Sequence, residues 1–500
     1  MEIYVLRHCK TECNLNNKWC GSKSDIGLSI EGKIQNEKVV KELSKINFDY
    51  IFTSPLKRCL VTSKQISKNT NSKLVIDNRL IERNFGELEG LNCNNDDKIK
   101  LADFELNTDL NKNVEKIYDM FFDRVLPFIK DIEKIKAKKI LIVTHSWVIR
   151  LFNYFFSNEV KNNEAIKMTP KNGEYKKFII NNDIISRHFN TLIVKGNKIT
   201  KKSAYLEKFN DEINWMVSIP NELKGFVPKI YDYRISTINN DKDFSYIRME
   251  YINKKSFEQF FINEKLTKKE ASIFFKHIDS FLKKTKEYNK EIDDNEKNKL
   301  LYNIYYLKTI DRVNSIKDDH NLNFFYNNKI IINNKEYYSI KTYMEKLLDV
   351  LNGYNLLNSK EMFCIIHGDL CFNNIIFNDN KMYLIDPRGS FGEKGIYGDQ
   401  IYELAKISHS ISGYDSIINN LFYLNVTDKN QIYYCLKKND NEELFRTFFE
   451  KMISSEETLK KVYLVESLLF LSMIPLHKEN YRHQLVMLSI AIEKLSKFIT

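Results

Sequence analysis

The chain has 500 residues, more than one hydrophobic core supports, so at least two domains are expected. Its hydrophobic fraction of 43% and charged fraction of 29% are those of a globular protein. The net charge of +11 is spread along an Asn-, Lys- and Ile-rich sequence without a basic block, which favours a coding bias over a nucleic-acid-binding face. Anionic small substrates would still benefit from the positive field.

The cysteines and the apolar runs predict a cytoplasmic protein. Eight cysteines are scattered without a Cys-x-x-Cys pair, and the sequence opens on a predicted strand rather than on a signal sequence. This pattern indicates reduced thiols. The most apolar late run, residues 462–476, is interrupted by Glu466 and Ser467, so we expect a buried helix and no membrane span.

Residues 1–183 are predicted to form a three-layer α/β sandwich. Strands are expected at residues 2–6, 51–53, 73–76 and 139–144, alternating with helices, of which the first is capped by Ser29. Residues 173–180 are expected to supply the last edge strand. In such a sheet the sites lie at the carboxyl ends of the strands, where the sequence places Arg7, His8, Arg58 and His145.

Five segments of this region, beginning at residues 7, 28, 51, 80 and 139, together resemble the histidine phosphatase (phosphoglycerate mutase-like) superfamily. The resemblance covers roughly the first third of the chain. It implies that His8 is the nucleophile and carries a phosphohistidine, and that Glu82 protonates the leaving alcohol. It also implies a phosphate pocket formed by Arg7, Asn14, Arg58 and His145. Guanidinium groups suit such a pocket, because they match phosphate oxygens in pairs.

Two positions depart from the usual pattern of this family. Cys9 stands where Gly usually follows the Arg-His pair, and Ser146-Trp147 stand where Gly often follows the second histidine. Cys9 is either a tolerated small residue or a redox-sensitive thiol. Trp147 either narrows the pocket mouth or packs in the sheet. The region lacks the long insertions associated with mutases, so net hydrolysis is favoured over phosphate shuttling.

A polar stretch at residues 181–186 marks the expected boundary between domains at 1–183 and 184–500. Residues 191–194 and 198–201 flank the turn Gly196-Asn197 and predict a β-hairpin. A helix from about residue 204 and strands at 227–231 and 246–252 follow. Later amphipathic patterns predict helices at residues 267–288, 339–352, 398–411, 443–453, 457–476 and 481–497.

Residues 365–377 read as a strand, a polar loop and a second strand, with Asp369 and Asn374 in the loop. A further strand at residues 381–385 ends in Asp386. Phosphoryl transfer from a Mg-nucleotide needs a carboxylate that accepts the hydroxyl proton, and an amide and a second carboxylate that hold the metal against the phosphates. This stretch therefore carries all three groups on adjoining loops.

The loop begins His367-Gly368-Asp369 and resembles the catalytic loop of protein kinases and, more closely, that of the aminoglycoside and choline phosphotransferases. The resemblance implies an α+β bilobal kinase-like domain, with an N-lobe at about 187–253 and a C-lobe at about 254–500. Asp369 would be the base. Asn374 and Asp386 would bind Mg²⁺, and His367 and Asp399 would support the loop.

The same resemblance implies a nucleotide site in the N-lobe. Lys201, or its neighbour Lys202, would meet the phosphates of ATP or GTP while the helix carboxylate of Glu212 holds it. Met249 and Tyr251 would lie beside the adenine. No Gly-x-Gly-x-x-Gly loop precedes the lysine, and the hairpin around residue 196 is its only candidate substitute.

Two further features leave alternatives open. Arg388 either contacts a phosphate or pairs with a neighbouring acid. Residues 299–338, in which aromatic and Asn residues alternate with basic ones, either shape the acceptor pocket or form an ordinary helical insertion.

The sequence thus predicts a bifunctional enzyme that hydrolyses a small phosphomonoester and phosphorylates a small-molecule hydroxyl with a nucleoside triphosphate. A role in sugar or surface-polysaccharide precursor metabolism rests on analogy at the level of the fold. One alternative is a choline- or ethanolamine-type kinase with an accessory phosphatase, whose acceptor would be recognised by aromatic side chains. Another is a regulatory or binding protein with one inactive domain.

Overall fold

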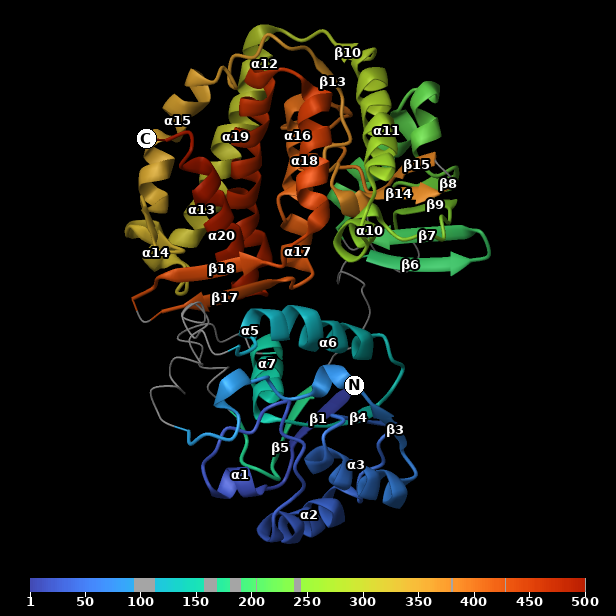
Figure 1. The fold of residues 1–500 in the computed structure, drawn as a ribbon. Helices are drawn as coiled ribbons and strands as arrows, with labels where there is room; N and C mark the ends of the chain where they lie inside the picture. Colours follow the sequence, from blue (N-terminus) through green and yellow to red (C-terminus); the bar gives the residue numbers. More distant parts are fainter. Residues whose placement is uncertain are drawn as a thin grey trace. The chain divides into compact units, whose positions relative to one another are not determined.

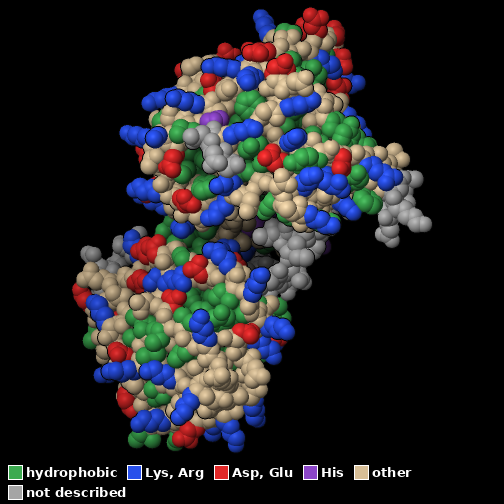
Figure 2. Space-filling model, turned by 90° about the vertical axis from the view of Figure 1, so that its right-hand side faces the viewer, with side chains coloured by type: hydrophobic (Ala, Val, Ile, Leu, Met, Phe, Trp, Pro, Cys, Tyr) green, Lys and Arg blue, Asp and Glu red, His purple; other side chains and the backbone are tan. Residues whose placement is uncertain are grey.

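The computed structural model describes residues 1–93, 113–156, 169–179, 190–203, 205–237, 244–378, 381–427 and 429–499. The chain divides into two compact units, Met1–Asp183 (the first unit) and Ile184–Thr500 (the second unit). On the face shown in Figure 2, Lys and Arg side chains are scattered over both units rather than gathered in one patch. Among the described helices, none has the length and apolar character needed to cross a membrane.

The first unit is built on a five-stranded sheet with the order β3-β2-β4-β1-β5. Its strands are β1 (Glu2–Arg7), β2 (Tyr50–Thr53), β3 (Lys73–Ile76), β4 (Lys139–Thr144) and β5 (Tyr175–Ile179). The first four are parallel, and β5 runs antiparallel to β1 at the edge. The predicted edge strand is therefore confirmed. The parallel strands bring the residues that follow them to one end of the sheet.

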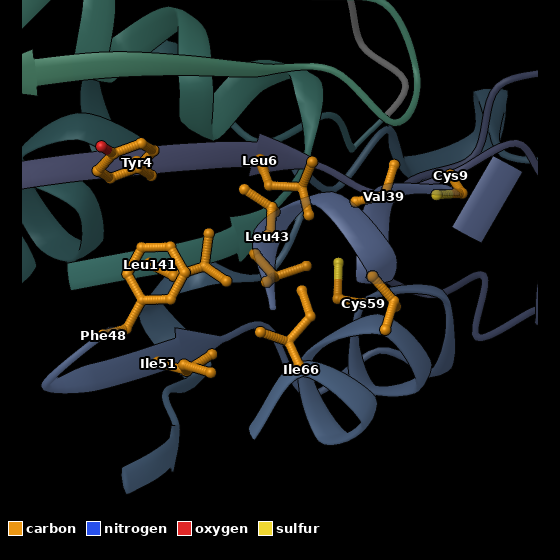
Figure 3. Packing of buried hydrophobic residues seen from close by; sticks show 12 residues of the cluster. Tyr4, Leu6, Cys9, Val39, Leu43, Phe48, Ile51, Cys59, Ile66 and Leu141 are labelled. Carbon is orange, nitrogen blue, oxygen red and sulfur yellow. The ribbon is translucent and has the colours of Figure 1, made fainter. Parts of the chain in front are cut away.

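Helices cover both faces of this sheet, which gives the predicted three layers (Figure 1). One face packs on α2 (Ile30–Leu43) and α3 (Lys57–Thr70), the other on α6 (Leu126–Glu133) and α7 (Ser146–Phe156). Adjacent residues of β2 serve opposite faces, as a strand requires. Ile51 lies in the apolar cluster with α2 and α3 (Figure 3), and Phe52 meets Phe128 of α6 with ring centroids 5.4 Å apart.

The start of α2 is fixed against the loop that follows β1. The Ser29 hydroxyl accepts a hydrogen bond from the Gly32 amide at 3.0 Å, so the predicted N-cap is confirmed. A Cβ atom on Gly32 would lie 1.9 Å from the Lys10 carbonyl oxygen. Glycine at this position therefore allows the helix to lie close to the loop that carries the candidate site residues. Shorter helical turns complete the unit: α1 (Glu12–Leu15), α5 (Ile117–Asp119), a π-helical turn (Met120–Val125) and 3-10 turns at Asn78–Leu80 and Gly86–Leu88.

The second unit opens with a four-stranded antiparallel sheet of order β6-β7-β9-β8. It comprises β6 (Asn190–Lys195), β7 (Lys198–Ser203), β8 (Ile230–Arg234) and β9 (Tyr246–Glu250), with the helix α9 (Leu206–Ser218) between β7 and β8 and a 3-10 segment at Asn221–Phe226. The predicted hairpin is confirmed, with Gly196 at φ +61° in its two-residue turn. Apolar residues of α9 pack against β9.

The rest of the second unit is mainly helical, as predicted. Its helices are α10 (Phe257–Asn263), α11 (Lys268–Lys286), α12 (Asp294–Leu301), α13 (Lys308–Lys317), α14 (Asn323–Asn327), α15 (Ile340–Gly353), α16 (Gln400–Ile411), α17 (Tyr414–Ile418), α18 (Asp440–Ile453), α19 (Glu456–Met473) and α20 (Tyr481–Leu495). A π-helical turn, Tyr302–Leu307, joins α12 to α13. Short 3-10 turns lie at Phe372–Asn374 and Ile474–His477.

Short strands among these helices hold the loops of interest. A three-stranded sheet contains β10 (Asn289–Lys290), β13 (Phe363–Ile365) and β16 (Tyr397–Gly398), and a hairpin contains β14 (Ile375–Asn378) and β15 (Lys381–Leu384). A further four-stranded sheet was not predicted; it contains β11 (Ile330–Ile332), β12 (Lys335–Tyr337), β17 (Phe422–Val426) and β18 (Ile432–Leu436).

Candidate active sites

The first unit contains a cavity of about 350 Å³ at the carboxyl ends of the parallel strands. Among the residues predicted to act there, Arg7, His8, Asn14 and Glu82 line it. Arg58 and His145 are fully buried and are not among its described lining residues. The structure thus brings four of the predicted residues to one cavity wall and places two in the protein beneath the surface.

His8 has the protonation state of a nucleophile. Its Nδ1 lies 2.8 Å from the Cys9 carbonyl oxygen, and because a carbonyl only accepts, Nδ1 carries the proton and Nε2 keeps its lone pair. Burial and the nearby Arg58 guanidinium hold the pKa of His8 well below its usual value. The imidazole is therefore neutral.

Arg58 and His145 form a buried pair next to His8. Arg58 Nε donates to His145 Nδ1 at 3.3 Å, and His145 Nε2 donates to the Ser54 hydroxyl at 2.7 Å. The rings of His8 and His145 have centroids 5.1 Å apart. The remaining guanidinium nitrogens of Arg58 donate to the carbonyls of Gly21 and Ser24. This arrangement fixes a positive charge behind the nucleophile.

Glu82 lies at the wall of the cavity, and its pKa is higher than that of an ordinary carboxylic acid. Its Oε1 accepts hydrogen bonds from the amides of Arg83 at 2.9 Å and Trp147 at 3.3 Å. Burial nevertheless raises the pKa of Glu82. A carboxyl group with a raised pKa at the wall of a cavity is better suited than an ordinary one to protonating a leaving oxygen.

Three residues of this cavity were missed or left open by the sequence analysis. Trp147 lines the cavity, with the guanidinium carbons of Arg83 and Arg150 4.6 and 5.1 Å from its ring centroid. Arg150 also lines the cavity, and it lies one turn after Ser146 on α7, so helix periodicity could have identified it. Asn172 donates to the His8 carbonyl at 3.0 Å from a loop that no local motif marks.

Cys9 has the environment of a packing residue. Its side chain is buried, and burial raises the pKa of the thiol to about 12. Because the thiolate is the reactive form, this environment favours the tolerated small residue over the redox-sensitive thiol.

The second unit brings together three charged residues that lie far apart in the sequence. Lys201 Nζ, on β7, lies 2.8 Å from Glu212 Oε1 of α9 and 2.9 Å from Asp386 Oδ1. Burial opposes the charge of Lys201, but the two carboxylates outweigh it and raise the pKa of the ammonium group. Lys202, the alternative, instead lies over the Phe244 ring at 3.7 Å.

Asp369 lies beside an amide and an ammonium group. Asn374 Nδ2 donates to the Asp369 carbonyl at 2.8 Å and to its Oδ2 at 3.1 Å, and Lys406 Nζ lies 2.9 Å from Oδ1. Burial alone would raise the pKa of Asp369, but the Lys406 charge dominates and lowers it to about 2. Lys406 was missed by the sequence analysis, although it lies on the helix that Asp399 begins.

Asn374 and Asp386 supply an amide oxygen and a carboxylate, the kinds of oxygen ligand that Mg²⁺ takes. The Ile385 amide donates to the Asn374 carbonyl at 3.0 Å, which sets Asp386 beside Asn374. Asp386 adopts the left-handed backbone, with φ +56°, a region that Asn and Asp enter more readily than other residues with a side chain. No group of three or more His, Cys, Asp and Glu side chains in the described part of the chain could hold a metal. Mg²⁺ commonly takes only one or two carboxylates and completes its shell with water and phosphate oxygens.

His367 supports the loop around Asp369 as predicted, whereas Asp399 does not contact that loop among the described residues. His367 Nε2 donates to the Ile385 carbonyl at 2.9 Å, which ties the two loops together. Glu403 accepts hydrogen bonds from the amides of His367 at 2.9 Å and Gly368 at 2.6 Å. Asp399 makes no such contact among the described residues, because it caps α16 through the Ile401 amide and accepts from the Tyr305 hydroxyl at 2.7 Å.

The two residues predicted to lie beside the adenine, Met249 and Tyr251, lie on and just after β9, and their role stays a prediction. Met249 is buried in the apolar cluster of the first sheet of the second unit, and its strand is paired on both sides, with Ile199 and Ile230 opposite it. The structure therefore uses Met249 for packing. Tyr251 follows the end of β9, and its amide donates to the Asn197 carbonyl at 2.9 Å.

Comparisons with known proteins concern the first unit. A family model described as histidine phosphatase superfamily (branch 1) matches residues 3–183. The 2,3-bisphosphoglycerate-dependent phosphoglycerate mutase of Buchnera aphidicola is 30% identical in an alignment 210 residues long that covers 35% of this chain and 90% of the mutase. A probable phosphatase of Schizosaccharomyces pombe is 26% identical in an alignment 148 residues long that covers 28% of this chain and 51% of that protein. Phosphoserine phosphatase 1 of Hydrogenobacter thermophilus is 32% identical over 91 residues, 18% of this chain and 43% of that enzyme. The chain thus spans only about half the length of the last two relatives.

Proposed function

Because the chain belongs, through residues 3–183, to the histidine phosphatase superfamily (branch 1), we propose that its first unit hydrolyses a small phosphomonoester. The observation that carries this proposal is the neutral His8, whose Nε2 lone pair is free at the wall of a cavity that Arg7 also lines. Arg7, together with the buried charge of Arg58, stabilises the negative charge that develops on the phosphoryl oxygens.

In the proposed reaction His8 Nε2 attacks phosphorus while the bond to the ester oxygen breaks. Glu82 gives its proton to that oxygen, and the alcohol leaves. Water then attacks the phosphohistidine, the Glu82 carboxylate takes a proton from the water, and phosphate is released with both residues restored. Hydrolysis, rather than the transfer named in the Buchnera relative, is favoured by the absence of long insertions.

The test is phosphate release from a panel of phosphosugars, phosphoserine, phosphoglycerates and nucleotides. His8→Ala should abolish release and also prevent formation of an acid-labile phosphoprotein. His320→Ala is a matched control, since His320 is exposed in the second unit. Release that survives His8→Ala would refute the phosphohistidine route.

For the second unit we propose transfer of a phosphoryl group from a nucleoside triphosphate, ATP or GTP, to a small-molecule hydroxyl. The contact of Lys201 with both Glu212 and Asp386 supports this proposal, since a buried ammonium group at an acidic loop is suited to phosphates. Asn374 and Asp386 would hold Mg²⁺, which would neutralise charge on the phosphates. Asp369 would accept the hydroxyl proton, and its low pKa keeps it ionised for that task.

Two substitutions separate an active kinase from an inactive nucleotide-binding domain. Asp386→Asn should weaken Mg²⁺-dependent nucleotide binding, whereas Asp369→Asn should leave binding intact and remove turnover. Asp349→Asn, at an exposed position of α15, is the control. If wild type binds nucleotide yet no hydroxyl compound stimulates ADP formation, the regulatory alternative holds.

A single chain that both removes and adds phosphate suggests two positions of one compound or two successive intermediates. A pathway toward an activated sugar or a surface-polysaccharide precursor would use such a pair. The choline- or ethanolamine-type alternative requires a cationic acceptor. The charges around Asp369 therefore bear directly on the choice between a sugar-type acceptor and a cationic one.

A further inference from the structure

Four cationic side chains gather around one tyrosine beside Asp369, and we call them the cation cluster. Lys308 and Arg312 lie one turn apart on α13, Arg388 lies on the loop after β15, and Lys406 lies one turn after Tyr402 on α16. The spacing of four residues on each helix places both members of a pair on the same face.

The hydroxyl of Tyr402 contacts two members of the cluster. It accepts hydrogen bonds from Arg388 Nη1 at 2.9 Å and Lys308 Nζ at 3.3 Å. Lys406 Nζ lies 6.0 Å from the Tyr402 ring centroid and 2.9 Å from Asp369 Oδ1. The cluster is therefore continuous with the carboxylate proposed as the base.

The cluster carries more positive charge than its protein neighbours balance. Asp369 pairs with Lys406, whereas within the described residues no carboxylate lies within ion-pair distance of Lys308, Arg312 or Arg388. Arg312 donates to the Ser472 carbonyl and hydroxyl at 3.1 and 3.4 Å. Lys308, Arg312 and Arg388 are half-buried, and charges partly withdrawn from water are costly unless they are paired.

The pKa values of Lys308, a member of the cluster, and of Tyr402, which the cluster surrounds, reflect this imbalance. Burial, with the neighbouring cations, lowers the pKa of Lys308 to about 8. Burial opposes ionisation of Tyr402, yet Lys308 and Arg388 outweigh it and lower the pKa of the phenol to about 7. Both shifts are those of a site that lacks a negative charge.

We propose that the cation cluster binds the anionic group, a phosphate or a carboxylate, of the hydroxyl compound that the second unit phosphorylates. This inference rests on the proposed kinase function. The bound anion would place the acceptor hydroxyl at Asp369, which takes its proton as the oxygen attacks the terminal phosphorus of the nucleotide. The bond to the nucleoside diphosphate breaks in the same step, and the diphosphate leaves.

Most of the cluster lies on elements that do not carry the proposed nucleotide contacts. Those contacts, Lys201 and Asp386, lie 2.9 Å from each other on β7 and on the loop after β15. Arg388 shares that loop with Asp386, whereas Lys308 and Arg312 come from α13 and Lys406 from α16. A cationic acceptor such as choline would meet repulsion from three cations that no carboxylate within ion-pair distance balances among the described residues, so this cluster disfavours that alternative.

The test uses full-length protein carrying His8→Ala, so that the first unit does not hydrolyse phosphorylated acceptors. ADP formation is measured with phosphosugars, hydroxy acids, the matching neutral sugars and amino alcohols. Comparison of the phosphosugars with the hydroxy acids distinguishes a bound phosphate from a bound carboxylate. We expect an anionic acceptor to be used at least about tenfold better than its neutral analogue, because charged hydrogen bonds of this kind contribute that factor or more.

Lys308→Gln should raise the KM for the acceptor about 10- to 100-fold and leave the KM for ATP within about twofold. Lys317→Gln, at an exposed position of the same helix, should change neither. Arg388→Gln repeats the measurement on a loop residue if Lys308→Gln does not fold. Preference for a neutral or cationic acceptor, or a rise in the KM for ATP instead, would overturn the assignment.

A binding measurement separates this inference from the kinase proposal. Binding of inorganic phosphate is measured calorimetrically in the His8→Ala protein with and without Lys308→Gln. Loss of a binding event with Lys308→Gln would support the anion site even if no acceptor were phosphorylated. Unchanged phosphate binding would overturn it even if the kinase were active.

Discussion

At the scale of single residues, burial sets opposite protonation states for the two central groups of the first unit. Withdrawal from water disfavours the charged form of each group, so it keeps the His8 imidazole neutral and raises the pKa of the Glu82 carboxyl. A neutral nucleophile and a protonated acid are what the first step of phosphoester cleavage requires. The same physical cause therefore prepares both partners.

Glu82→Gln should slow hydrolysis of alkyl phosphates by about 10²- to 10⁴-fold, the usual contribution of a general acid. The loss should be much smaller with an aryl phosphate, whose leaving group needs no proton. Because the pKa of Glu82 is raised, wild-type activity should persist above the range of an ordinary carboxylic acid and fall as the pH rises through that pKa. Equal losses on both substrates would remove Glu82 from the acid role.

Tyr402 should make acceptor binding depend on pH. Its pKa of about 7 means that the phenolate forms as the pH rises above neutrality and then competes with an anionic acceptor for Lys308 and Arg388. Lys406 of the same helix and Asp369 also face it. The KM for the acceptor should therefore rise from about pH 7 in wild type, whereas in Tyr402→Phe only the deprotonation of Lys308, with its pKa of about 8, should raise it. Identical pH profiles for the two proteins would contradict this competition.

At the scale of elements, α9 and α16 connect the two loops of the proposed kinase site. Trp215 of α9 donates from Nε1 to the Ile366 carbonyl at 2.6 Å, and Glu403 of α16 holds the next two amides of that loop. Gly389 lies against α9 at φ +65°, and a Cβ atom there would lie 2.1 Å from the Asp211 carbonyl oxygen. Glu212, the next residue of α9, is the one that pairs with Lys201.

Gly389→Ala should therefore separate α9 from the loop of Asp386. The strained backbone should cost about 1–3 kcal/mol of stability, and Mg²⁺-dependent nucleotide binding should weaken. Thermal unfolding and nucleotide titration measure the two effects. Gly353→Ala is the control, since no atom outside its own helix and chain neighbours lies within 4 Å of the added Cβ. A Gly389→Ala protein that binds nucleotide normally would show that the close approach is not needed.

The elements also show which sequence signals were informative. The strand ends at Arg7 and His145 and the loop at Asp369 were predictable, because short apolar runs bounded by polar residues define strands locally. The sheet containing β11 and β17 was not predicted, since its hairpins join only through tertiary contact, although Asn333 and Asn334, at φ +48° and +65°, form a recognisable hairpin turn.

The candidate sites were predictable where a motif carried the residue and not where a helix face carried it. Asp399 begins α16, and Tyr402, Glu403 and Lys406 follow at the spacings that share its face. Asp399 was predicted from the sequence, but the three residues that follow it on the helix were not. Lys308 lies directly after a π-helical turn, and no local pattern signalled its partnership with Tyr402, 94 residues away.

At the scale of the whole molecule, each unit has its own apolar core and its own candidate site. The two activities should therefore be separable by substitution. His8→Ala and Asp369→Asn each change a single side chain within one unit, so each should remove one activity and leave the other within about twofold, as independent sites do.

A chain with opposed activities would waste nucleotide if both units acted on the same phosphate. We expect ADP formation by wild type, with ATP, Mg²⁺ and a limiting amount of acceptor, to stop after one equivalent of acceptor is consumed. The phosphate added by the second unit is then not a substrate of the first. The His8→Ala protein gives the reference end point, because it cannot remove phosphate. Continued ADP formation in wild type, with a normal end point in His8→Ala, would mean that the two units act on one position and that the pathway role proposed for them is wrong.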